Sequence, residues 1–443
     1  MGSLVISNAT VATLGADNQV LDGHDVVCRD GVIEAVVPHR PTPPAGVERT
    51  IDARGRLVMP GFINAHMHFY STLVRGLGKA APSRDFTEVL KHLWWRLDRK
   101  LLLEDCYVSA LIPLLAAIRH GTTTLIDHHA SPGAVRGSLD AIARAVKETG
   151  LRASLCYEVS DRDGEGIARE GLEENVAFIR RLSGEPDPQL RALFGLHASF
   201  TLGERTLARA ASLGHELGAG FHIHVAEAES DQRHCLDTHG CRVVERLLRH
   251  GILGPLSIAA HCVHVSEWEL DLLAETAAAV VHNPQSNMNN AVGVADILRM
   301  FAKGILVGLG TDAMTVNMLE EVRSALWAQR LLHRHPSVAF VEALSTLANN
   351  NASIASRYWD PPVGELRPGF AADLIILDYE PPTPLTAGTF LGHLAFGLPL
   401  ARVATTIVGG KVLMEEGRLL IDADEARIAA RSRELAAALW ERF

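Results

Sequence analysis

Two histidines, His66 and His68, stand at the end of an apolar segment with a single residue between them. Because side chains alternate along a β-strand, both imidazoles point to the same side of a sheet and can chelate one ion. Two ordinary half-buried histidines explain an H-x-H motif equally well. The motif therefore needs support from other residues.

That support comes from further strand-like segments that end in metal-binding residue types. His224 and Glu227 close one segment (HIHVAE), His261 closes another (HCVH), and HNP and GTD close the last two. In a barrel of parallel strands these ends converge on one face. A separate buried partner for each histidine would be costlier than one shared ion. The pattern predicts one metal site, with the ligands His66, His68, His224 and Asp312.

Three imidazoles and one carboxylate suit a divalent transition ion, zinc first, with iron or manganese as alternatives. The fourth strand-like segment offers His197 but no lysine near its end. This speaks against a lysine carbamate that bridges two ions, so one ion is expected. A divalent ion with an open ligand position lowers the pKa of bound water, and the expected chemistry is therefore hydrolysis.

The elements that would position these residues alternate between strand and helix. Each parallel strand pair needs a helical crossover, so eight alternations predict a (β/α)₈ TIM barrel over residues 57–361, with a doubly wound open sheet as the alternative. The connection over residues 69–121 is long enough for a lid that contains Trp94 and Trp95. The eight strand segments are Leu57–Ile63, Thr122–Asp127, Arg152–Glu158, Arg191–Leu196, Gly220–Val225, Leu256–Cys262, Ala278–Asn283 and Ile305–Gly310.

Both ends of the chain carry a different pattern, of short strands joined by tight turns. Hairpin turns are expected at Asp30-Gly31 and at Gly409-Gly410. We predict that residues 1–56 and 362–443 form one small β-sandwich domain, with a terminal helix. Within the part of the sequence assigned to the barrel, Gly121 and Gly150 indicate helix ends, and Ser266 with Glu269 is expected to form a capping box.

Composition narrows the class of protein. The 443 residues are 47% hydrophobic and 21% charged, as is usual for globular proteins. The formal charge of −10 disfavours nucleic-acid or anionic-membrane partners and favours a small-molecule substrate. No apolar run is long enough for a membrane span, and the six cysteines form no C-x-x-C pair. A cytoplasmic homo-oligomer, dimer or larger, is expected.

The order HMH, HVAE, AHC, HNP, GTD resembles the amidohydrolase superfamily, specifically its aminohydrolase and chlorohydrolase branch. The resemblance spans nearly the whole chain, since MPGF (residues 59–62), GELRPG (364–369) and AADL (371–374) are also typical of it. The stretches LWWRLD (93–98), DHHASP (127–132) and YEVSDR (157–162) further resemble the bacterial aminohydrolases called SsnA.

The resemblance implies roles for three residues. Glu227 would shuttle a proton to a ring nitrogen of the substrate, although a surface carboxylate that starts the next helix is the alternative. His261 would orient the attacking nucleophile and stabilise the developing oxyanion. Asp312 would act as ligand and as base, passing a proton to the departing amine.

The leading functional hypothesis is hydrolytic deamination of an amino-substituted nitrogen heterocycle, such as a purine, pterin or pyrimidine, with release of ammonia. Dechlorination of a triazine-like ring is the enzymatic alternative, and a catalytically silent binding barrel is the alternative of another class. Candidate substrate contacts, which the sequence alone cannot rank, are His197, His282, Trp94 and His128.

Overall fold

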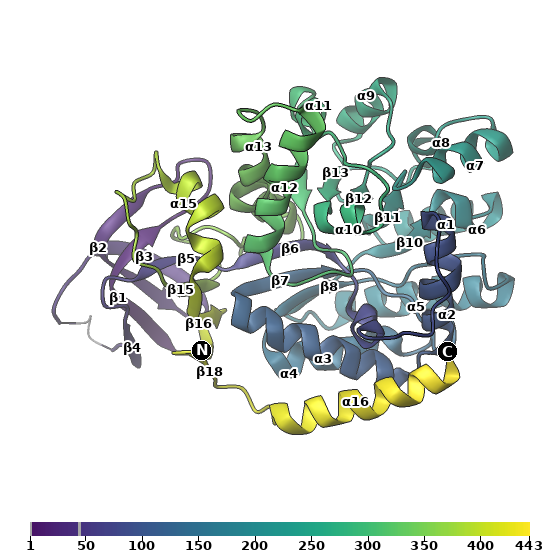
Figure 1. The fold of residues 1–443 in the computed structure, drawn as a ribbon. Helices are drawn as coiled ribbons and strands as arrows, with labels where there is room; N and C mark the ends of the chain where they lie inside the picture. Colours follow the sequence, from purple (N-terminus) through teal and green to yellow (C-terminus); the bar gives the residue numbers. More distant parts are fainter. Residues whose placement is uncertain (1, 43–45) are drawn as a thin grey trace.

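The computed structural model describes residues 2–42 and 46–443, and its larger part is a closed barrel of parallel strands with helices outside (Figure 1). Two sheets make up its wall, and they join where Val159 bridges Leu196 and where Met67 bridges Asp312. The barrel strands are β6 (Phe62–Met67), β7 (Thr122–Asp127), β8 (Arg152–Leu155), β9 (Leu190–Ala192), β10 (Phe194–Ala198), β11 (Phe221–Val225), β12 (Ile258–His261), β13 (Ala279–His282) and β14 (Val307–Leu309).

The predicted TIM barrel is confirmed, with two differences in detail. Leu193 alone separates β9 from β10, so together they occupy the fourth of eight barrel positions. The segment Leu57–Ile63, expected as one barrel strand, is divided at Gly61. Its first half, β5 (Leu57–Pro60), pairs with strands of the other sheet, and only β6 enters the barrel.

The helices outside the barrel end where the sequence indicates. Gly121 and Gly150 take left-handed φ values of 72° and 81°, which a residue without a Cβ adopts at little cost. Ser266 and Glu269 form the expected capping box. These helices are α3 (Leu103–His120), α4 (Ser138–Thr149), α5 (Glu165–Gly184), α6 (Glu204–Glu216), α7 (Glu229–His239), α8 (Val243–Arg249), α9 (Glu267–Thr276), α10 (Pro284–Asn289), α11 (Ile297–Ala302), α12 (Met318–His333), α13 (Phe340–Ser345) and α14 (Asn351–Ala355).

One buried side chain fastens the seam between the first and last barrel strands. The Asn351 amide at the start of α14 donates to the Ile63 carbonyl at 2.6 Å and to the Leu309 carbonyl at 2.8 Å. Its Oδ1 accepts from the Leu309 N–H at 2.7 Å. Asn351 therefore holds together the two strands that carry His66 and lead to Asp312.

The two ends of the chain form one mixed sheet of nine strands in the described residues, in the order β18-β17-β16-β15-β5-β1-β2-β3, with β4 beside β1. We expected a β-sandwich, but the strands share a single hydrogen-bonded network with its own apolar core. Both expected hairpin turns are present, with left-handed φ at each turn residue. The strands are β1 (Ser3–Ala12), β2 (Val20–Arg29), β3 (Val32–Pro38), β4 (Arg49–Asp52), β15 (Leu374–Asp378), β16 (Arg402–Val408), β17 (Lys411–Glu415) and β18 (Arg418–Leu419).

A buried ion pair joins this sheet to the barrel. Arg152 of β8 donates from Nε to Oδ2 of Asp373 at 2.6 Å and from Nη2 to Oδ1 at 3.2 Å. The Gly409 N–H donates to the same carboxylate at 2.6 Å, and Arg152 also donates to the Pro188 carbonyl at 2.7 Å. The ion pair therefore links β8 of the barrel to the start of β15 and to the turn between β16 and β17.

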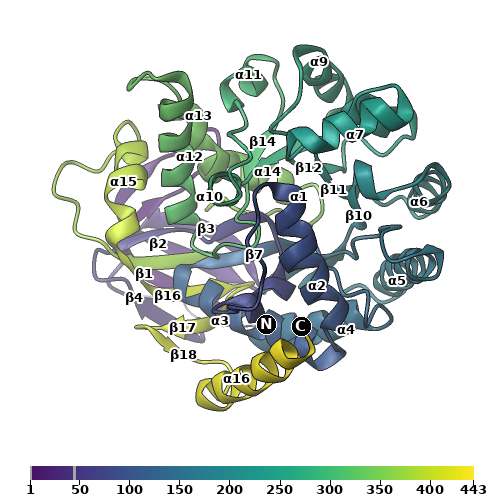
Figure 2. The same ribbon diagram turned by 45° about the vertical axis from the view of Figure 1, so that its right-hand side comes forward.

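The segment between β6 and α3 folds over the mouth of the barrel (Figure 2). It consists of the 3₁₀ turn η1 (Phe69–Val74) and a continuous helical stretch over residues 86–100 that includes α1 (Phe86–Val89) and α2 (Trp95–Leu97). We call residues 69–100 the lid. The terminal helix α16 (Glu425–Arg442) lies along α3, and its end reaches the lid (Figures 1 and 2).

Hydrogen bonds fix α16 to the lid. The Trp440 indole N–H donates to the Leu73 carbonyl at 2.8 Å, and Arg96 donates to the Phe443 carbonyl at 2.6 Å. In the described part of the chain, no single helix is long and apolar enough to cross a membrane. One pair bent by 111°, Phe86–Lys100 with Leu103–His120, passes that test only when the two are counted together.

Candidate active site

The residues expected to bind metal meet at the carboxyl ends of the barrel strands. His68 Nε2 lies 2.9 Å from Asp312 Oδ1 and 3.2 Å from His224 Nε2. His66 Nε2 lies 3.8 Å from the same Asp312 oxygen. Each of these four side chains is at least nine-tenths buried. Residues from β6, β11 and the end of β14 thus form one cluster.

The second ring nitrogen of each histidine has its own partner, which orients the ring. His68 Nδ1 lies 2.5 Å from the His128 carbonyl and His224 Nδ1 lies 3.0 Å from the His197 carbonyl. A carbonyl can only accept, so both rings carry their proton on Nδ1 and present a lone pair at Nε2. His66 Nδ1 lies 2.8 Å from His222 Nε2.

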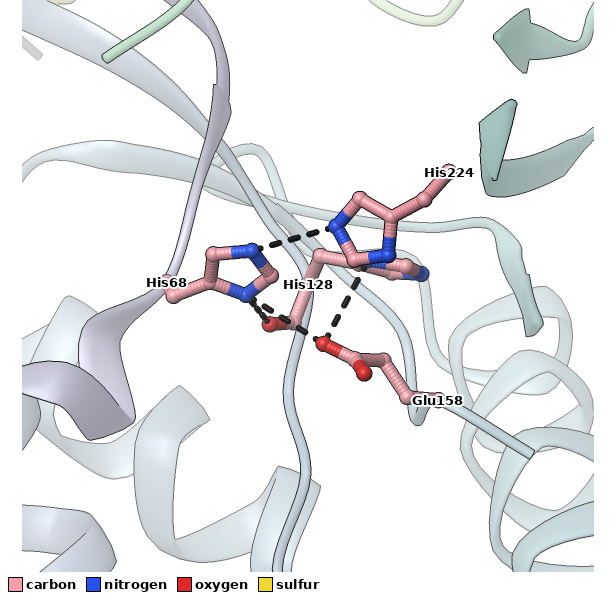
Figure 3. A group of neighbouring side chains, drawn as sticks. All are labelled: His68, His128, Glu158 and His224. Carbon is pink, nitrogen blue, oxygen red and sulfur yellow. Dashed lines mark hydrogen bonds and ion pairs between the residues drawn. The ribbon is translucent and has the colours of Figure 1, made fainter. Parts of the chain in front are cut away.

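This donor set fits a divalent cation. The Nε2 lone pairs of His68 and His224 face each other at 3.2 Å (Figure 3), and the buried Nε2 of His66 has no hydrogen-bond partner among the residues that the structure describes. Neighbouring ligands of a tetrahedral zinc ion, each about 2.0–2.1 Å from it, are separated by about 3.3 Å. A positive charge between them, either a metal ion or a proton on His68 Nε2 directed at Asp312, relieves the repulsion between the lone pairs of His68 and His224. The arrangement therefore fits a metal centre.

Unusual backbone conformations occur at the same strand ends. His261 has a φ of 73° and Asp312 a φ of 51°, in the left-handed region that non-glycine residues rarely adopt. Such strain persists only where the surrounding structure imposes it, and it is concentrated at functional sites. The Ser286 hydroxyl donates to Asp312 Oδ2 and holds the carboxylate in place.

Glu227 lies beside the cluster, with its Oε2 3.6 Å from His261 Nε2. Its Oε1 accepts a hydrogen bond from the Asn290 amide at 3.4 Å. Burial raises the pKa of Glu227 well above its usual range, and the charge of Asp312 adds to this. This shift favours the protonated form of the Glu227 carboxyl. Burial lowers the pKa of His261 to about 4, so this imidazole is neutral.

A pocket opens onto these groups between the barrel and the lid. Its inner end is formed by cluster residues, and its wall is rich in aromatic rings and charged groups. The residues that line it include His68, Glu158, Arg162, His197, Phe200, His224, Glu227, Ser286, Asn290 and Asp312 of the barrel, and Tyr70, Phe86, Leu90, Trp94, Trp95 and Asp98 of the lid.

The sequence pattern of the amidohydrolase family matches residues 57–413. The chain belongs to the amidohydrolase family. It is 33% identical over 450 residues to the 5-methylthioadenosine/S-adenosylhomocysteine deaminase of Pelotomaculum thermopropionicum, which covers 100% of both chains. It is 32% identical over 446 residues to the 5′-deoxyadenosine deaminase of Methanosarcina acetivorans, covering 100% of this chain and 99% of the relative.

Solved structures share the fold of this amidohydrolase. A zinc-bound adenosine deaminase from Xanthomonas campestris superposes with a TM-score of 0.84 at 24% identity, over 99% of this chain and 98% of the other. The zinc-bound atrazine chlorohydrolase from Arthrobacter aurescens gives a TM-score of 0.81 at 24% identity, over 98% and 100%. The full-length curated relatives confirm the prediction of a metal-dependent deaminase, a hydrolase that acts on cyclic amidines.

The four candidate substrate contacts of the amidohydrolase fall into two pairs. Trp94 and His197 line the pocket. His128 and His282 do not, because both rings are fully buried behind the cluster. The His128 ring stacks on His222 with centroids 4.4 Å apart. Burial and the neighbouring His261 lower the pKa of His282 to about 3, so its ring is neutral. The structure thus gives neither residue a surface for substrate.

Sequence reasoning gave no role to Ser286, Asn290 or Glu158, which also line the pocket. Ser286 and Asn290 lie four residues apart, on and just after α10, so both side chains reach the same face. The HNP motif, whose Pro284 begins α10, indicated a functional strand end but gave no role to the side chains of that helix. Glu158 is the third residue after the end of β8, and in the sequence it stood out only as part of the stretch YEVSDR, which gave it no role.

Proposed function

We propose that this amidohydrolase is a zinc-dependent deaminase that removes the 6-amino group of a 5′-substituted adenosine. The two full-length relatives support this, because both are named for adenosine derivatives that differ only at the 5′ position. The adenine ring is the part that their substrates share. The groups that act on such a ring are those at the inner end of the pocket.

The proposed metal ligands are the four clustered side chains, His66, His68, His224 and Asp312. Three nitrogens and one carboxylate oxygen match zinc, and the zinc in two structural neighbours is consistent with this choice. When bound, zinc would supply a Lewis acid that makes water a nucleophile at neutral pH.

Glu227 carries the proposal of deamination. Carbon 6 of adenine becomes electrophilic when the neighbouring ring nitrogen is protonated, and a buried carboxyl whose pKa is raised well above its usual range is suited to donate that proton. Simple amide hydrolysis has no such need. Asn290 holds Oε1, which leaves the carboxyl at the edge of the pocket where a ring nitrogen would lie.

His261 and Asp312 have complementary roles in the proposal. Neutral His261, held by the Asn287 side chain 2.8 Å from its Nδ1, orients the attacking oxygen through Nε2. Asp312 accepts the proton that water loses on attack and passes it to the departing amine, which leaves as ammonia, while the proton of the new hydroxyl at carbon 6 returns to Glu227 as the carbonyl forms. The aromatic rings of Trp94 and Trp95 in the pocket wall offer flat surfaces for a purine.

The test is a substrate panel with the zinc-loaded enzyme. Ammonia release should be found with 5′-deoxyadenosine, 5-methylthioadenosine, S-adenosylhomocysteine or adenosine, with the corresponding inosine as the product. A chlorotriazine serves as the control, and chloride should not appear. Absence of ammonia from every adenosine derivative, with the metal in place, would overturn the proposal.

Three further expectations from the sequence do not belong to this proposal and stay predictions. The likeness to SsnA aminohydrolases rests on stretches around Trp94, His128 and Glu158, and the relatives above do not test it. A homo-oligomeric state and a cytoplasmic location are likewise predictions, which size-exclusion chromatography with light scattering and cell fractionation would check.

A further inference from the structure

We infer that Glu321 is a positioning residue for the reaction and that it acts through the short helix α10. Glu321 lies on α12, is fully buried and is not among the residues that line the pocket. The proposed chemistry gives it no part. Since its effect is exerted on Glu227, His261 and Asp312, the role of Glu321 rests on the function proposed above.

One turn of α10 links the proposed proton acceptor to the proposed proton donor. The Ser286 hydroxyl donates to Asp312 Oδ2. The Asn290 amide donates to Glu227 Oε1 at 3.4 Å and to the Ser286 hydroxyl at 3.3 Å. Because residues four apart lie on the same face of a helix, a single turn reaches both carboxyl groups.

The next residue of the same turn reaches the third group. Asn287 Nδ2 lies 2.8 Å from His261 Nδ1, and both side chains are fully buried. The three groups follow or end three different strands, β11, β12 and β14, and each of them contacts the turn formed by α10 and Asn290. A displacement of this turn would therefore disturb all three groups at once.

The position of α10 depends in turn on α12. The Gln285 N–H donates to Glu321 Oε1 at 3.0 Å, and the Gln285 side-chain amide donates to the Ser324 hydroxyl at 3.2 Å. Asn283, the residue before α10, makes no capping bond with its side chain. Glu321 thus takes the place of the side chain that usually satisfies the first N–H groups of a helix.

The other oxygen of Glu321 shows that this bond is the main contribution of the side chain. Oε2 is buried and has no hydrogen-bond partner in the part of the chain that the structure describes. A buried carboxyl with a single bonded oxygen is costly, and an apolar side chain would pack α12 against its neighbours at lower cost. Glu321 therefore serves to hold α10 and not to pack α12.

The experiment compares two near-isosteric variants of the zinc-loaded enzyme. E321M fills the same volume but removes the acceptor, and E321Q keeps an oxygen acceptor for the Gln285 N–H. Deamination is expressed as kcat per bound metal. E321M should lose about 10- to 100-fold with little change in KM, because small misplacements of aligned groups cost rate, and E321Q should keep most of the activity. Full activity in E321M, or an equal loss in both variants, would overturn the inference.

A double-mutant cycle tests whether the effect passes through α10. N290A removes the amide that holds Glu227. If Glu321 acts through the same turn, E321M/N290A should lose clearly less than the product of the two single losses. A loss that equals this product within about twofold would show independent effects and overturn the inference.

Glu174 provides a matched control, because it makes the same kind of contact far from the chemistry. It is a buried carboxyl of α5 that accepts from the N–H groups of Gly137 and Leu139, at the start of α4, at 2.9 and 3.0 Å. No residue of α4 lines the pocket. E174M should destabilise the fold but keep kcat. A loss of kcat in E174M as large as in E321M would reduce the effect to a lost helix contact and overturn the inference.

Amide hydrogen exchange at single-residue resolution gives a readout that needs no substrate. The Gln285 amide should exchange slowly in the wild type, and exchange over residues 284–290 should become faster in E321M but not in E174M. Fast exchange of Gln285 in the wild type would overturn the inference without any variant having to fold. Absence of deamination in the wild type would count against the proposed function, whereas an active wild type with full activity in E321M would count against Glu321 alone.

Discussion

Replacement of Asn351 by alanine should destabilise the barrel at its closing seam. Its amide makes three buried hydrogen bonds, to the Ile63 carbonyl and to both backbone groups of Leu309. Alanine leaves the Leu309 N–H without this partner, and each carbonyl loses one bond. The perturbation acts on β6 and β14 at the point where the ring closes.

The size of the loss follows from these three groups. An orphaned buried N–H costs about 1–3 kcal/mol, and each lost carbonyl bond costs about 0.5–1.5 kcal/mol. The sum for Asn351→Ala is about 2–6 kcal/mol of unfolding free energy. Because β6 carries His66 and β14 leads to Asp312, the variant should also bind metal more weakly.

The assay is equilibrium unfolding in urea with metal-free protein, followed by a metal titration of the folded protein. Ser353→Ala on the same helix is the control, since that side chain is exposed and its hydroxyl donates to the Asn349 carbonyl of its own helical stretch at 3.3 Å. A loss below about 1 kcal/mol for Asn351→Ala, no larger than for the control, would refute the reasoning.

Three further predictions concern catalysis, domain contact and the lid. E227Q should keep its bound metal but lower kcat/KM for deamination by about 10²- to 10⁴-fold, because the glutamine amide cannot supply the proton. Unchanged turnover would exclude Glu227 as the proton donor. R152A should cost about 3–5 kcal/mol in urea unfolding, because Asp373 is left as an unpaired buried charge; a cost under about 1 kcal/mol would contradict this. Removal of residues 440–443 deletes the hydrogen bond from Trp440 to the Leu73 carbonyl. The KM for the substrate should rise, and amide hydrogen exchange over residues 73–100 should become faster. An unchanged exchange rate would speak against a lid held by α16.

Much of the architecture was predictable because it depends on local sequence signals. Glycine after α3 and α4, the Ser266 capping box and the two hairpin turns each fix backbone geometry within a few residues. The convergence of His66, His68, His224 and Asp312 follows from strand alternation together with the parallel order of a barrel. These features need no knowledge of side-chain packing.

Other features depend on contacts between distant parts of the chain. The segment around Gly61 reads as one apolar strand, and only pairing with β1 and β15 assigns its first half to the other sheet. Whether His282 faces the pocket or the interior depends on how neighbouring strand ends pack, which a motif does not record. The Glu158 carboxylate lies 3.5 Å from His128, which directly follows β7, and 3.8 Å from His197 of β10.

The pairing of β5 bears on how this protein is made on the ribosome. Leu57 of β5 pairs with Leu377 of β15, which is translated 320 residues later. At about 5–20 residues per second, the edge of β5 waits roughly 15–60 s for that partner. During translation the edge of LVMP that later pairs with β15 is open to association with other nascent chains. Slower elongation or a shortage of chaperones should therefore reduce the yield of folded enzyme, whereas the stability of the finished molecules should not change.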